Sequence, residues 1–148
     1  MMRDKILEAA LELYTSKPPC EISVEDIATK AGVSTGLIFY YFKSKDNLER
    51  ELALYMIEKY LRLEVNTLRE YVEAALELAE TMPGLSRFLQ YVFEKEMYAG
   101  RTDLAQKLYE EGLKAIAKLL RDCGSEDPER TAILVMAMLD GLALYALF

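Results

Sequence analysis

The sequence predicts an all-α protein of about eight helices, and three observations support this fold class. Apolar residues recur at intervals of three and four along most of the chain, Gly and Pro separate the apolar segments, and no segment shows the alternation of a β-strand. The 148 residues are 52% hydrophobic and 29% charged, which is a globular composition. We expect a three-helix head in residues 1–45 and a helical body in residues 46–148.

The head begins with an amphipathic helix from residue 3 to about residue 16, which the pair Pro18 and Pro19 ends. Ser23 can cap a short second helix that ends near Lys30. Gly32 tolerates the positive φ of a tight turn, and Ser34 can cap a third helix directly after it. The first helix has its apolar face at Ile6, Leu7, Ala10, Leu11 and Tyr14.

The body is predicted to contain five more helices. Ser44 can cap the first of them, Met82-Pro83-Gly84 interrupts the pattern, and Asp127 can cap the last with Pro128 in its first turn. The expected ranges are about 44–62, 66–80, 85–98, 102–122 and 127–148.

Charge and composition exclude several classes of protein. The net charge is −7, but the first fifty residues hold seven Lys and Arg against eight acids, so most of the acidity belongs to the body. There is no histidine, and Cys20 and Cys123 are far apart, which argues against His-dependent nucleophiles, zinc sites and a disulfide framework. The many Asp and Glu residues do not form a recognisable catalytic pair, so they give weak support for an enzyme. We therefore expect a protein without enzymatic activity, metal or cofactor.

The chain is expected to be cytoplasmic and to have no membrane partner. Its first residues begin an amphipathic helix and not the continuous apolar segment of a secretory leader. The apolar segment 131–148 contains Asp140 and Gly141 near its middle, and a central carboxylate is costly in a bilayer.

Residues 24–42 have the pattern of a helix-turn-helix unit. Ala28 allows two helices to approach closely, Gly32 makes the turn, and Val33 and Ile38 fill the space between the helices. Such a unit presents its second helix, about residues 35–41, to the major groove of DNA. Its N-terminal residues Ser34, Thr35 and Gly36 have short or absent side chains, which would allow a close approach.

Residues 3–50 resemble the N-terminal domain of the tetracycline-repressor (TetR/AcrR) family of regulators. The matching segments are ILEAA (6–10), ISVEDIA (22–28), AGVS (31–34) and GLIFYYFKSK (36–45). The resemblance implies contacts with bases and phosphates at Thr35, Gly36, Leu37, Tyr40, Tyr41 and Lys45. One position departs from the pattern: Phe39 replaces the usual tyrosine and cannot donate a hydrogen bond to phosphate.

The aromatic run 39–42 cannot be buried as a whole, because successive residues of a helix point about 100° apart. We expect Phe42 in the core and Tyr40 or Tyr41 on the DNA. A simple solvated charge is the alternative for Lys45. However, a cation in the first turn of a helix opposes the helix dipole and suits a phosphate neighbour.

The last two helices are the expected homodimer interface. The final helix is apolar nearly all round, which requires burial from more than one side, although it could also be the core of a monomer. A twofold dimer would set two recognition helices about one turn of DNA apart and predicts a near-palindromic operator. The expected contact residues are Leu134, Ala137, Met138, Gly141 and Tyr145.

The resemblance further implies repression that a small apolar ligand relieves. The fourth helix joins Lys45 to the body, so a ligand beside it could tilt the head. The body is shorter than usual for the family, which predicts a small or absent pocket. The open alternative is a dimeric interaction protein of the same fold without ligand response or DNA binding. Candidate pocket residues are Tyr55, Met56, Phe88, Tyr91, Val92, Glu96 and Met97.

Overall fold

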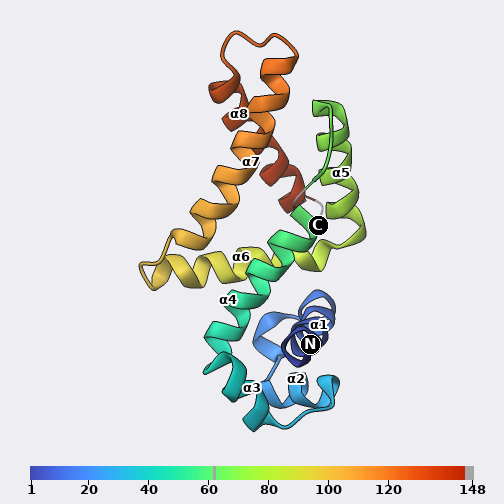
Figure 1. Cartoon of the computed structure of the whole chain (residues 1–148), viewed down its shortest axis with the longest axis vertical. Helices are drawn as coiled ribbons and strands as arrows, with labels where there is room; N and C mark the ends of the chain where they lie inside the picture. The colour runs from blue at the N-terminus through green and yellow to red at the C-terminus, as the bar shows by residue number, and fades with distance from the viewer. Residues whose placement is uncertain (62, 146–148) are drawn as a thin grey trace.

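A computed structural model describes residues 1–61 and 63–145 and confirms the all-α class (Figure 1). The described residues form eight α-helices and no strand. A short 3-10 turn follows the first helix, and a π-helical turn, η2 (Ile57–Leu61), extends the fourth. The α-helices are α1 (Met2–Ser16), α2 (Val24–Ala31), α3 (Thr35–Phe42), α4 (Lys45–Met56), α5 (Leu68–Thr81), α6 (Pro83–Tyr98), α7 (Asp103–Asp122) and α8 (Pro128–Tyr145).

The helices form a head and a body that α4 connects (Figure 1). Helices α1 to α3 make the head, and α4 runs from the head into the body, where α6 crosses it. Helices α7 and α8 pack along each other on the far side of α6 from the head, and α5 packs against α6, α7 and α8.

The predicted helix boundaries hold to within about two residues, with two informative differences. Helix α6 begins at Pro83, where the sequence suggested a break, because proline is tolerated in the first turn of a helix. Helix α4 ends at Met56, and the chain continues to Leu61 with π-helical bonds. The last residues of the predicted final helix, 146–148, lie outside the described residues.

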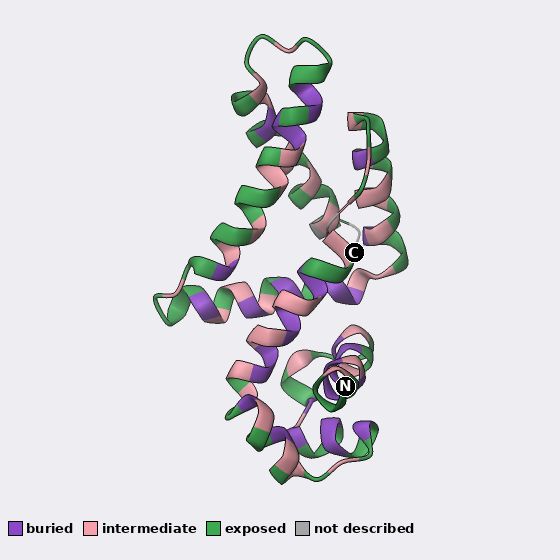
Figure 2. Cartoon of the chain, in the orientation of Figure 1, coloured by how far each residue is buried: buried purple, intermediate pink, exposed green. Residues whose placement is uncertain are grey.

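Most buried residues, purple along the ribbon in Figure 2, belong to two hydrophobic clusters. The larger cluster joins the head to α4 and α6, and includes Tyr14, Phe42 and Phe88. The smaller one lies between α5, α7 and α8 around Ile116 and Ala132. The head is therefore packed on α4 and α6 by one continuous core, to which Leu104 of α7 also belongs, while the other buried residues of α7 and α8 belong to the smaller cluster.

Gly84 fixes where α6 crosses the head. It is buried against the end of α1, and a Cβ atom added there would lie 2.1 Å from the carbonyl oxygen of Thr15. A side chain at this position would therefore separate the two helices.

In the described part of the chain no helix is both long enough and apolar enough to span a membrane.

Candidate nucleic-acid interface and internal cavity

The helix pair α2 and α3 is built by local capping. The Ser23 hydroxyl accepts from the amide of Asp26 at 3.1 Å, and the Asp26 carboxylate accepts from the amide of Ser23 at 2.8 Å. This reciprocal box begins α2, and its bonds hold the pKa of Asp26 below its ordinary value. Ser34 begins α3 by accepting from the amide of Leu37 at 3.2 Å.

Gly32 makes the turn between the two helices. Its φ of 65° lies in the left-handed region, which glycine adopts without strain. The amide of Val33 then bonds back to the carbonyl of Ala28 at 2.9 Å. The turn thus sets α3 directly after α2, as the sequence predicts.

Helix α3 has one buried and one exposed face. Ile38 and Phe42 are fully buried, which confirms Phe42 as a core residue. On the opposite side, Tyr40 is 68% exposed and Phe39 is 45% exposed. The ring of Tyr40 contacts that of Tyr41 edge-on, with centroids 5.3 Å apart. The buried side chains of Ile38 and Phe42 therefore fix α3 on the head and leave its aromatic outer face exposed.

The remaining residues expected to contact DNA lie around this outer face. Ser34 and Gly36 are exposed, whereas Thr35, Leu37 and Tyr41 are half-buried. Gly36 leaves the N-terminal turn of α3 open, since the nearest atom to an added Cβ would be the Ser34 hydroxyl at 3.8 Å.

The two lysines that follow α3 differ in their surroundings. Lys45 is half-buried, and its Nζ donates to the carbonyl of Ile22 at 2.5 Å and lies 3.6 Å from Glu49. Lys43 is exposed, and its Nζ donates to the carbonyl of Tyr40 at 2.9 Å beside the Tyr40 ring. Lys43, at the end of α3, was not among the residues that the sequence predicted to contact DNA.

The five residues expected at the dimer interface share one face of α8. Leu134, Met138 and Tyr145 are 60%, 67% and 81% exposed, and Ala137 and Gly141 between them are also exposed. Large apolar side chains and small residues thus form a continuous exposed strip. Met136, Leu139, Asp140 and Ala143 of α8 line a cavity of the body, and Asp140 is itself exposed.

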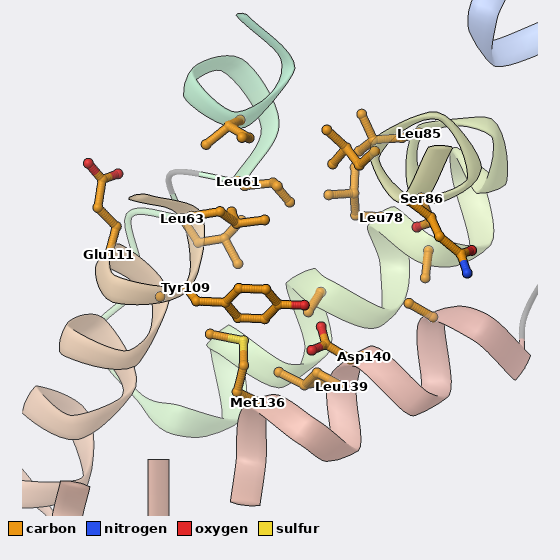
Figure 3. Close-up of a pocket in the computed structure, with 18 of the residues that line it drawn as sticks. Leu61, Leu63, Leu78, Leu85, Ser86, Tyr109, Glu111, Met136, Leu139 and Asp140 are labelled. Carbon is orange, nitrogen blue, oxygen red and sulfur yellow. The ribbon is translucent and has the colours of Figure 1, made fainter. Parts of the chain in front are cut away.

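A cavity of about 850 Å³ lies between η2 and helices α5 to α8 and opens to the surface, where the lining residues Met97 and Asp140 are exposed. Apolar side chains dominate its wall, and the ring of Tyr109 lies across it with its hydroxyl toward Asp140 (Figure 3). Partial burial raises the pKa of Asp140, and burial together with the neighbouring Asp140 raises that of Tyr109. The short body therefore holds a pocket of the size that accepts drug-sized ligands.

Of the seven candidate pocket residues, Met97 alone lines this cavity. Met56, Phe88 and Val92 are buried in the larger core cluster. Tyr55 bonds to Glu8 instead. The cavity lies on the other face of α6, lined by Leu85, Ser86, Leu89, Gln90, Phe93 and Glu94.

A buried carboxylate, Glu49, joins α1, α4 and α6. It accepts from the Tyr14 hydroxyl and from Lys95 Nζ, each at 2.5 Å, and the Tyr91 hydroxyl lies 3.4 Å away. Burial and the bond to Glu49 raise the pKa of Tyr14 well above its ordinary value. Glu49 was missed as a notable residue, although it shares the helical spacing of the buried Leu52 and Met56.

A second ionic cluster surrounds Glu96 near the end of α6. Arg50 of α4 pairs with Glu96 and with Asp103 of α7, and Arg101 bonds to Glu96 at 2.6 Å. Arg101 also reaches Asp46 at the start of α4, at 3.1 Å. Ion pairs therefore connect α6 to α4 on the face away from the cavity, among them one between Lys95 and Glu49 and one between Glu96 and Arg50.

The chain was compared with protein families and curated proteins. Residues 6–52 match the family of bacterial regulatory proteins of the tetR type. The chain is 33% identical over 92 residues to YttP of Bacillus subtilis and 27% identical over 136 residues to the HTH-type transcriptional regulator AcrR of Shigella flexneri. These alignments cover 62% and 82% of this chain, but 41% of YttP and 63% of AcrR, so the chain spans less than two thirds of either relative.

Solved structures share the fold over nearly the whole chain. A transcriptional regulator from Rhodococcus sp. Rha1 superposes with a TM-score of 0.77 at 22% identity, covering 97% of this chain and 82% of that one. GusR of Salmonella enterica gives 0.73 at 20% identity, covering 99% and 87%.

The fold and the capped α2–α3 pair define a helix-turn-helix protein carried on a helical body. Residues 6–52 match the tetR family of bacterial regulatory proteins, as the resemblance of residues 3–50 implied, and the solved structures share the fold of nearly the whole chain.

Proposed function

We propose that the chain is a homodimeric, sequence-specific DNA-binding transcriptional regulator that acts as a repressor and is released by a small ligand. The observation that carries the proposal is the outer face of α3. Its aromatic side chains are exposed while Ile38 and Phe42 are fully buried, an arrangement with no advantage for stability. A helix held in this way is suited to entering the major groove.

The polar groups around α3 support contacts with phosphates. The first turn of α3 follows the Ser34 cap, which takes the amide of Leu37, and its N-terminal amides lie next to the open position at Gly36. At the other end of the helix, Lys43 offers an exposed ammonium group. Tyr40, with its exposed hydroxyl, takes the donor role that Phe39 lacks.

The exposed strip of α8 supports a homodimer. Ala137 and Gly141 allow a second helix to approach closely, and Leu134, Met138 and Tyr145 surround them with apolar surface. A twofold axis at this strip makes the same residues meet on both subunits. The two heads would then lie on the same side of DNA, about 34–36 Å apart.

Helix α6 supports a coupling between ligand and DNA. One face of α6 lines the cavity, and the other is joined to α4 through Glu49 and Glu96. Because α4 begins next to α3, a ligand that shifts α6 would move α4 and alter the separation of the two heads.

A salt titration of DNA affinity tests the proposal. Fluorescence anisotropy with a labelled duplex selected by the protein should show affinity that falls with salt, and Lys43→Ala should lower the slope by about one contact. Tyr40→Ala should weaken binding about tenfold. The matched controls Lys118→Ala and Tyr98→Ala, exposed residues of the body, should change neither quantity.

Two outcomes would contradict the proposal. The first is that the head variants and the body controls change DNA affinity and its salt dependence equally. The second is a dimer that binds no duplex even at low salt, which would favour a dimeric interaction protein of the same fold.

A further inference from the structure

Most of the basic side chains in residues 1–50 are already paired with acids. Four of the seven Lys and Arg have an acidic group within 4 Å, in the pairs Arg3–Glu51, Lys30–Glu12, Lys45–Glu49 and Arg50–Glu96. Lys5, Lys17 and Lys43 have no such partner in the described part of the chain. A phosphate that binds one of these three lysines does not have to displace an acid that is already bound.

Lys5 and Lys17 lie at opposite ends of α1 and have different surroundings. Lys17 follows the last turn of α1 and interacts electrostatically with Asp26 at the start of α2. The side chain of Lys5 is exposed and makes no hydrogen bond or ion pair with any residue that the structure describes. The acids of α1 have partners of their own, in the pairs Asp4 with the amino group of Met1, Glu8 with Lys59 and Glu12 with Lys30. The ammonium group of Lys5 therefore receives no counter-charge from its own helix.

The ammonium group of Lys5 lies beside the turn that precedes α3. Its Nζ is 3.9 Å from the position that a Cβ atom on Gly32 would occupy. Gly32 is exposed and ends α2, and Ser34, two residues further on, caps α3. The N-terminal end of a helix carries a partial positive charge that favours a phosphate. Lys5 adds a full positive charge near the end of α3 that already favours an anion.

Lys43 occupies the opposite end of α3. Its exposed Nζ donates to the carbonyl of Tyr40 at 2.9 Å and has no acidic partner in the described part of the chain. Helix α3 has eight residues and is therefore about 12 Å long, which is about the width of the major groove. A helix of this length in the groove brings both of its ends close to the phosphates that border the groove. Lys5 and Lys43 thus stand at the two ends of α3.

We propose that Lys5 of α1 binds a DNA phosphate at the N-terminal end of α3, as the counterpart of Lys43 at the other end. The proposal rests on the proposed function and deepens it, because it adds a contact from a helix outside the helix-turn-helix pair. A phosphate at Lys5 breaks no ion pair of the head, whereas a phosphate at Lys30 competes with Glu12, which lies 2.5 Å from the lysine Nζ.

The salt dependence of DNA affinity tests the proposal, because each phosphate contact releases counterions on binding. Fluorescence anisotropy measures the affinity of the full chain for a duplex that it selects, between about 50 and 200 mM salt. Lys5→Ala should lower the slope of log affinity against log salt by as much as Lys43→Ala, about 0.9 for each contact removed. The double variant should lower it by the sum, and Lys5→Arg should keep the slope of the unmodified chain.

Two controls separate a phosphate contact from other effects of the substitution. Lys30→Ala removes another exposed lysine of the head, one that is already paired, and should leave the slope unchanged. Thermal melting followed by circular dichroism should give the same midpoint for Lys5→Ala and the unmodified chain, because the Lys5 side chain has no partner to lose.

Three results would overturn the inference: an unchanged slope in Lys5→Ala, an equal decrease in Lys5→Ala and Lys30→Ala, or a decrease in Lys5→Arg as large as in Lys5→Ala. The second would show that only the total charge of the head matters. Failure of the proposed function is a different result, since the unmodified chain would then bind no duplex even at low salt. If the unmodified chain binds DNA and Lys43→Ala alone lowers the slope, the inference fails and the proposed function stands.

Discussion

The hydroxyl of Tyr14 donates a 2.5 Å hydrogen bond to the carboxylate of Glu49, and both side chains are buried. The bond joins the first helix of the head to the helix that connects head and body. Lys95 of α6 binds the other oxygen of the same carboxylate at 2.5 Å. The carboxylate of Glu49 in α4 is thus bonded to a side chain of α1 and to a side chain of α6, and it connects the three helices.

Removing the Tyr14 hydroxyl should destabilise the fold. Tyr14→Phe keeps the ring packed on Phe88 but deprives a buried carboxylate of a donor, so we expect the free energy of unfolding to fall by about 1.5–3 kcal/mol. Urea denaturation followed by circular dichroism measures the change. Tyr98→Phe, at a residue that is 87% exposed, should leave the midpoint unchanged. Equal midpoints for both variants would show that the buried bond has no net effect.

A methyl group at position 84 should disturb the crossing of α6 over α1. Gly84→Ala places an atom in contact with the backbone of Thr15, which cannot rotate away, and we expect a loss of about 1–3 kcal/mol or more. Gly36→Ala, where the nearest atom would be 3.8 Å away, is the control and should be neutral or slightly stabilising. Thermal melting compares the two, and an unchanged melting temperature for Gly84→Ala would contradict the close approach.

A charge on the exposed strip of α8 should abolish self-association. Met138→Glu adds a carboxylate to the centre of the expected interface and, by the twofold axis, brings two of them together. Sedimentation velocity should show a monomer, and circular dichroism should show unchanged helix content. Met2→Glu, also an exposed methionine replaced by an acid but in the head, should leave the association state unchanged. If the Met138→Glu variant remained a dimer, the interface would not lie on the exposed strip of α8.

Low pH should weaken the ion pair between Asp46 of α4 and Lys95 of α6. The bond from Lys95 holds the pKa of Asp46 below its ordinary value of 3.8, so the folded state binds this proton less tightly than the unfolded chain does. The contribution of Asp46 is present above pH 3.8 and is lost as the pH falls through the lower value of the folded state.

The expected result is a decrease in the free energy of unfolding below about pH 4 that is shallower in Asp46→Asn than in the unmodified chain. Asp122→Asn serves as the exposed control. Urea titrations at several pH values measure the slopes. Indistinguishable slopes for Asp46→Asn and the unmodified chain would mean that the pair with Lys95 does not stabilise the fold.

Much of the head could be predicted from the sequence because its signals are local. The Ser23 and Ser34 caps and the Gly32 turn act within four residues, so they appear directly in the chain. Helical geometry excluded the burial of all four aromatic residues 39–42, and Phe42, the one expected in the core, is fully buried.

The cavity could not be placed in the same way because its location depends on how α6 is rotated. An apolar residue of α6 can face either the head or the body, and Phe88 and Phe93 illustrate the two choices. The contact of Gly84 with Thr15 and the bond from Lys95 to Glu49 set the rotation, and both join residues far apart in sequence. No periodicity within α6 contains this information.

The most direct test of the central claim is selection of duplex DNA from a randomised pool by the full chain. The account predicts enrichment of a near-palindromic site whose two half-sites are centred about one helical turn apart, roughly 34–36 Å, and loss of enrichment in Tyr40→Ala. The exposed control Tyr98→Ala should select the same site. Failure of the unmodified chain to enrich any sequence, or enrichment that Tyr40→Ala leaves intact, would contradict the assignment of α3 as the reading helix.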